Sequence, residues 1–169
     1  MINKIPQDVK NIYDKLEEKG YEIYLVGGCV RNLLMDLKVK DWDLTTSAIP
    51  EEILKVFPNG FYNNDFGTVG IPTDEEGIVE ITTYRTEYGF SNKRHPDKVA
   101  WGKTIEEDLS RRDFTMNAIA LKWSMVNLPA GKAGGKSSIV YVDPFSGRKD
   151  IENKISQIKN LDEWMGSSH

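Results

Sequence analysis

LVGGCVRNLLMDLKVKDWD, residues 25–43, combines a glycine pair, an arginine and two closely spaced aspartates within nineteen residues. Burial of apolar side chains accounts for the leucines and valines of this stretch, and it leaves the other residues without a role. The residues that need a different explanation are Gly27, Gly28, Arg31, Asp41 and Asp43.

The glycine pair stands between strand formers, YEIYLV (21–26), and a segment from Val30 to Asp36 that suits a short helix. Glycines have no Cβ atom, so backbone N–H groups at such a turn can approach a phosphate closely, and the start of the following helix favours negative charge. Arg31, one turn further on, can add a forked donor to the same anion. The pattern therefore predicts a phosphate-binding turn.

The two aspartates belong to DWDLTTS (41–47), which alternates between apolar and polar residues as a strand does. On a strand, Asp41 and Asp43 point to one face, opposite Trp42. Paired carboxylates suit a hard cation such as Mg²⁺, which prefers oxygen ligands. A metal site next to a phosphate-binding turn is the arrangement that nucleotidyl transfer uses. For an isolated D-x-D pattern, a solvated turn stays open as the alternative.

Length and composition limit the class of protein. The chain has 169 residues, of which 39% are hydrophobic and 28% charged, which is typical of one domain with a real core. A net charge of −4 argues against a purely electrostatic clamp on nucleic acid. No apolar run approaches the ~20 residues that span a bilayer. A single cysteine, Cys29, and a charged N-terminus without a signal-peptide core lead us to expect a cytoplasmic protein with no membrane partner.

The rest of the sequence predicts alternating helices and strands. Helices are predicted at 6–19, from Pro50 onward, at 104–111 and within 143–155, and strands at 66–71, 78–85, 115–123 and 139–143. Residues 86–100 are polar and aperiodic, so they are interpreted as a mobile surface loop. The Gly/Lys/Ser-rich stretch 127–138 departs from the P-loop pattern, because Ala130 stands where that pattern needs a glycine. It is interpreted as a flexible hairpin insertion.

The stretch LVGGCVRNLL…KDWDLTTSAIPEEI resembles the active-site signature of class II tRNA nucleotidyltransferases, the CCA-adding enzymes, and of the related poly(A) polymerases. The resemblance continues in FGTV (66–69), in SRRDFTMNAIA (110–120) and in YVDPFSGRKDI (141–151), and it covers residues 21 to 152 in the family's order. It implies an α+β, polymerase-β-like nucleotidyltransferase fold, in which helices flank a small mixed β-sheet. Residues 1–155 would form this catalytic head domain.

The resemblance also implies roles for single residues. Asp41 and Asp43 would bind the catalytic Mg²⁺ ions. Glu80 would supply a third carboxylate that activates the 3′-hydroxyl of the primer, with an ordinary strand-face acid as the alternative. Asp113 would brace the turn of the RRD sequence. The residues implied to bind the nucleotide are Gly27, Gly28, Arg31 and Arg112.

The implied activity is Mg²⁺-dependent transfer of CMP or AMP from CTP or ATP to the 3′ end of tRNA, which is CCA addition or part of it. Asn32 stands where the family has an aspartate, and no E-D-x-x-R neck pattern follows residue 152. Residues 156–169 are therefore interpreted as the truncated start of a neck or as a tag-like tail.

Without neck and tail domains we expect weak tRNA binding, and self-association or a partner chain at the surface that would face the neck. Two alternatives stay open for the function. The first is a nucleotide-binding head module that is inactive without a separate neck and tail chain, rather than an enzyme by itself. The second is a fragment of a poly(A) polymerase.

Overall fold

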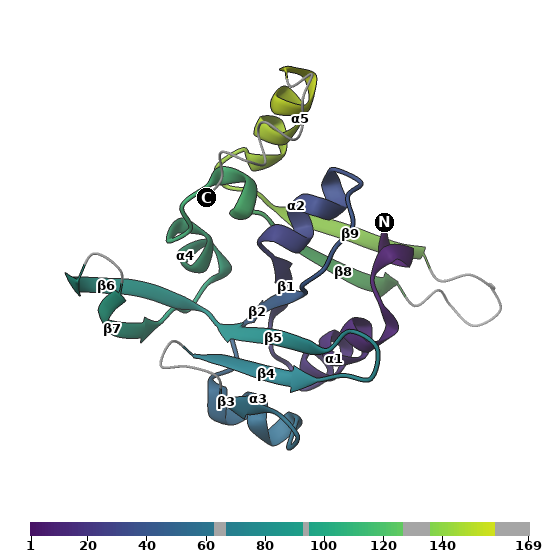
Figure 1. Ribbon diagram of the computed structural model, residues 1–169. Helices are drawn as coiled ribbons and strands as arrows, with labels where there is room; N and C mark the ends of the chain where they lie inside the picture. The colour runs from purple at the N-terminus through teal and green to yellow at the C-terminus, as the bar shows by residue number, and fades with distance from the viewer. Residues whose placement is uncertain (63–66, 93–94, 127–135, 158–169) are drawn as a thin grey trace.

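A seven-stranded mixed sheet forms the centre of the molecule (Figure 1). The computed structural model describes residues 1–62, 67–92, 95–126 and 136–157. The strand order is β3-β4-β5-β2-β1-β8-β9, with β2 parallel to β5 and the other neighbours antiparallel. The sheet is therefore mixed, as the resemblance predicted. These strands are β1 (Ile23–Val26), β2 (Asp43–Thr46), β3 (Phe61–Tyr62), β4 (Thr68–Pro72), β5 (Ile78–Thr83), β8 (Ala120–Val126) and β9 (Lys136–Val142).

Five α-helices surround the described part of the sheet. They are α1 (Gln7–Glu18), α2 (Gly28–Leu34), α3 (Pro50–Val56), α4 (Ile105–Ser110) and α5 (Gly147–Gln157). Val9, Ile12 and Leu16 recur at helical spacing on α1, and all three are buried against the core. The side chain of Thr104 accepts a hydrogen bond from the backbone N–H of Glu107 and so caps the start of α4. None of the described helices is long and apolar enough to cross a membrane.

Residues 86–92 and 95–100 are not a loop, contrary to the sequence-based interpretation. They form most of a separate two-stranded antiparallel sheet, β6 (Arg85–Asn92) and β7 (His95–Trp101), which extends away from the main sheet in Figure 1. Strands that pair only with each other are held by main-chain hydrogen bonds, and these require no apolar alternation. Periodicity therefore could not reveal the hairpin.

One predicted strand boundary differs from the structure, and the predicted domain boundary is not tested by it. The predicted strand 115–123 begins with a 3₁₀ turn, Thr115–Asn117, and only then enters β8. The predicted domain boundary at residue 155 falls within α5, and residues 158–169 lie outside the described part of the chain. Residues 127–135 of the Gly/Lys/Ser-rich stretch also lie outside it, so both interpretations stay predictions.

Candidate active site

Three carboxylates meet at one cleft beside the centre of the sheet. Asp43 on β2 and Glu80 on β5 are direct partners across the parallel strand pair. Asp41, Asp43 and Glu80 all line the same cleft, whose volume is about 770 Å³. The alternation predicted for this strand is also present, because Trp42 and Leu44 are buried in the core behind the acids. The structure thus brings together the three predicted catalytic carboxylates.

The electrostatics of Asp43 fit a cation. Burial, together with the negative charges of Glu80 and Asp41, raises the pKa of Asp43 to about 6, although the positive charge of Arg112 acts in the opposite direction. The negative charges of these neighbouring carboxylates repel one another, and a bound divalent cation would neutralise them. No three His, Cys, Asp or Glu side chains form a ready-made metal cage within the described ranges. Mg²⁺ does not need one, since one or two carboxylates, water and substrate phosphates usually complete its shell.

The predicted glycine turn opens directly beside these acids. Gly27 follows β1 and has φ +74 and ψ −144, a conformation that residues with a Cβ atom rarely adopt. A Cβ atom built on Gly27 would lie 3.5 Å from Nη1 of Arg112 and 3.8 Å from Oδ2 of Asp43. A phosphate in this space would therefore contact the turn, the arginine and a metal held by the acids together.

Arg31 covers the second glycine of the turn. Its Nη2 lies 3.4 Å from the position of a Cβ atom on Gly28. Arg31 Nη1 donates to Oδ1 of Asn117 at 3.0 Å, and Nε donates to Oδ1 of Asn32 at 3.2 Å. Asn32 also donates from Nδ2 to the carbonyl of Lys38 at 3.1 Å. An aspartate could not make that last bond, so the asparagine both orients Arg31 and ties the end of α2.

Arg112 is held by a residue that the sequence analysis did not single out. Asp108, on α4, is 0% exposed, and its Oδ2 accepts from Nη2 of Arg112 at 3.2 Å. Its Oδ1 accepts from Arg111 at 3.2 Å and from the backbone N–H of Arg85 at 3.3 Å. The carboxylate therefore fixes the guanidinium of Arg112 with Nη1 toward Gly27. The i,i+3 and i,i+4 spacing of Asp108 to the two arginines is the signal that could have found it.

The predicted brace at Asp113 is wrong. The Asp113 side chain is exposed, whereas Asp108 makes the buried contacts to both arginines. Nε of Arg112 is buried and has no hydrogen-bond partner among the described residues.

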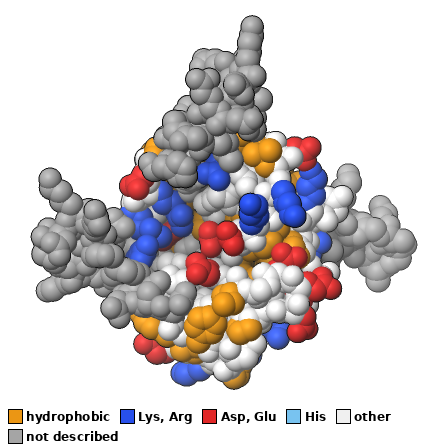
Figure 2. Space-filling view, in the orientation of Figure 1, with side chains coloured by type: hydrophobic (Ala, Val, Ile, Leu, Met, Phe, Trp, Pro, Cys, Tyr) orange, Lys and Arg blue, Asp and Glu red, His pale blue; other side chains and the backbone are white. Residues whose placement is uncertain are grey.

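Charged side chains of both signs lie on the face of the molecule shown in Figure 2. Acidic side chains gather near the centre, basic side chains flank them, and a hydrophobic patch lies below.

Cys29, within the glycine turn, is buried and donates to the carbonyl of Val26 at 3.1 Å. Burial raises the pKa of its thiol to about 12, so it has no nucleophilic role at neutral pH.

The sequence profile of the poly(A) polymerase head domain matches residues 23–157. The chain belongs to the poly(A) polymerase head-domain family. This head domain is 40% identical over 151 residues to the CCA-adding enzyme of Geobacillus sp. (strain WCH70), which covers 88% of this chain and 33% of that protein. It is 46% identical over 111 residues to a CCA-adding enzyme of Lactobacillus delbrueckii subsp. bulgaricus, covering 65% of this chain and 28% of the relative.

Solved structures of relatives show the same head-domain fold. The CCA-adding enzyme of Bacillus stearothermophilus in complex with CTP superposes with a TM-score of 0.67 at 34% identity, over 88% of this chain and 32% of that one. A tRNA nucleotidyltransferase complexed with a primer tRNA and an incoming ATP analog superposes with a TM-score of 0.58 at 27% identity, over 85% and 37%. The head domain has the polymerase-β-like nucleotidyltransferase fold that the resemblance predicted. It spans about a third of the length of the curated relatives that it matches.

Proposed function

We propose that this head domain transfers a nucleoside monophosphate from CTP or ATP to the 3′ end of tRNA, using Mg²⁺ held by Asp41 and Asp43. The observation that carries the proposal is that Asp43 lines one cleft with Glu80 and also lies next to the Gly27 turn, where a Cβ atom on Gly27 would be 3.8 Å from its Oδ2. The relatives solved with CTP, and with a primer tRNA and an ATP analog, support the same classes of substrate.

The nucleotide-binding residues lie on the β1 side of Asp43. The backbone of Gly27 and Gly28 receives the triphosphate, and Arg31 and Arg112 add forked donors to its oxygens. The bound metal supplies charge neutralisation at the reacting phosphorus. Asp108 keeps Arg112 in place without touching the nucleotide.

The reaction joins the primer to the α-phosphorus of the nucleotide. The primer 3′-oxygen forms a bond to that phosphorus, the bond from it to the α–β bridging oxygen breaks, and pyrophosphate leaves. Glu80 takes the proton of the 3′-hydroxyl. Such a transfer depends mainly on in-line positioning and charge stabilisation, and these are what the cleft offers.

An extension assay tests this function. The chain is incubated with Mg²⁺, each of the four nucleoside triphosphates and tRNA that ends at its discriminator base, in C or in CC. Extension by CMP or AMP supports the proposal. Binding of CTP without extension of any primer supports the inactive head module instead. Extension of every primer into a long A tail points to poly(A) addition. Neither binding nor extension overturns the proposal.

A further inference from the structure

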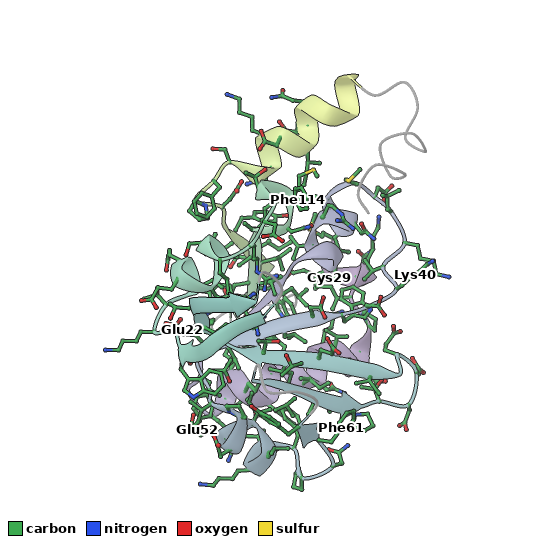
Figure 3. The ribbon with its side chains drawn as sticks, turned by 60° about the vertical axis from the view of Figure 1, so that its left-hand side comes forward. Glu22, Cys29, Lys40, Glu52, Phe61 and Phe114 are labelled. Atoms are coloured by element: carbon green, nitrogen blue, oxygen red, sulfur yellow. The ribbon has the colours of Figure 1, made fainter. Side chains whose placement is uncertain are left out.

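One row of directly paired residues crosses four strands of the sheet. Phe61 on β3 pairs with Gly70 on β4, Gly70 pairs with Glu80 on β5, and Glu80 pairs with Asp43 on β2. Directly paired residues direct their side chains to the same face of a sheet. Phe61 is therefore on the face of the carboxylates, and Figure 3 shows it at the end of the molecule opposite α5.

Gly70 allows two apolar side chains to close over this row. A Cβ atom on Gly70 would lie 2.6 Å from Cζ of Phe61 and 3.0 Å from Cγ2 of Ile78, so both side chains occupy the space above the glycine. Phe61 and Ile78 remain 37% and 52% exposed. Both line the cleft that contains the three carboxylates. We call these two side chains the apolar shelf.

The strand order fixes which side of the carboxylates the shelf occupies. Along β3-β4-β5-β2-β1, Phe61 of the shelf comes first, Ile78 shares β5 with Glu80, Asp43 follows on β2, and the Gly27 turn directly follows β1. The triphosphate of the proposed reaction lies at the Gly27 end. In an in-line transfer the attacking and leaving oxygens stand on opposite sides of the phosphorus. The attacking hydroxyl must therefore arrive from the end where the shelf lies.

We propose that the apolar shelf receives the 3′-terminal nucleoside of the RNA primer. The base stacks on the ring of Phe61 and against Ile78, and this contact places the ribose 3′-hydroxyl beside Glu80. Unpaired RNA ends are commonly held by stacking on aromatic side chains, which works for every base because each has a π-face. The shelf thus accepts a primer that ends in any nucleotide. The inference rests on the proposed transfer reaction.

Photo-crosslinking of a primer terminus locates the nucleoside. An RNA acceptor-stem hairpin with 4-thiouridine as its last nucleotide is irradiated with the chain, in the presence of Mg²⁺ and a non-hydrolysable CTP analogue. We expect crosslinked peptides to contain Phe61 or Ile78. Crosslinks confined to other segments, or no crosslink at all, overturn the inference. A crosslink at the shelf from 4-thio-UTP in place of the primer assigns it to the incoming nucleotide and also overturns it.

Three variants separate stacking from folding. Phe61→Ala is expected to raise the dissociation constant for the hairpin about tenfold, since one base–aromatic stack is lost. Phe61→Tyr keeps the ring and should bind as the unmodified chain does. Phe145→Ala removes a phenylalanine of similar exposure, 45%, outside the cleft and should change nothing.

The dissociation constant for the CTP analogue and the melting temperature are measured on each variant. The dissociation constant for the CTP analogue should stay unchanged in Phe61→Ala, and the melting temperature checks that the variant is folded at the assay temperature. Unchanged hairpin affinity in Phe61→Ala refutes the shelf. Failure of the unmodified chain to bind the CTP analogue counts against the proposed function. The hairpin measurements still test, independently, whether the apolar shelf binds the primer terminus.

Discussion

Asp43 and Glu80 are direct partners on β2 and β5, the one parallel strand pair in the described sheet. The backbone N–H of Glu80 also donates to the carbonyl of Trp42 at 3.2 Å. This bond continues the pairing toward the N-terminal side of Asp43 and anchors the residue next to Asp41. The geometry of the acidic site is thus set by main-chain pairing rather than by flexible side chains.

Replacing Asp43 or Asp41 by asparagine is expected to lower the rate of nucleotidyl transfer at least about a thousandfold. A neutral amide binds the cation weakly, and several kcal/mol of charge stabilisation is lost with it. Glu80→Gln should cost about a hundredfold, the range for a general base. Single-turnover extension at saturating CTP and Mg²⁺ measures these rates. Full activity of either aspartate variant contradicts the metal assignment.

Asp108→Asn is expected to lower the free energy of unfolding by about 3 kcal/mol, because Arg111 and Arg112 then lose a buried counter-charge. The freed Arg112 should also raise the KM for CTP. Urea denaturation measures the first effect and extension kinetics the second. Asp113→Asn is the matched control, since that side chain is exposed, and it should stay within about 0.5 kcal/mol of the unmodified chain. Equal stability of the two variants would rule out the brace.

Gly27→Ala should weaken binding of the CTP analogue by at least about tenfold, because a methyl group would occupy the space beside Arg112 and Asp43. The positive φ of Gly27 adds a loss of stability of about 1–3 kcal/mol. Gly20→Ala is the control, since Gly20 has φ +88 and nothing within 4 Å of its added Cβ atom. It should lose stability and keep nucleotide affinity. Similar affinity losses in both variants would show that strain alone is responsible.

The thiol of Cys29 is expected to react with iodoacetamide at pH 8 at least about a hundredfold more slowly than the thiol of the unfolded chain. It is buried, and its raised pKa leaves almost no thiolate at that pH. Mass spectrometry of alkylation over time, with and without urea, measures the difference. Rapid alkylation of the folded protein would mean that the glycine turn opens frequently.

Much of the site could be predicted from residues close together in the chain. The strand, the glycine turn, the short helix and the alternation around Asp41 and Asp43 each follow from local sequence, because periodicity and the absence of a Cβ atom act over a few residues. The family resemblance added Glu80 and Arg112. The β6–β7 hairpin escaped prediction, since its pairing has no apolar signature.

The sequence by itself determined the glycine turn, the paired aspartates and the membership of a family, all of which depend on order along the chain. Only the tertiary structure decided that Asp108 holds Arg112 and that Phe61 shares a face with the carboxylates. The physical reason is register. Which residues stand opposite each other on β3, β4, β5 and β2 depends on the packing of the whole sheet, and a shift of one residue would turn Phe61 to the other face.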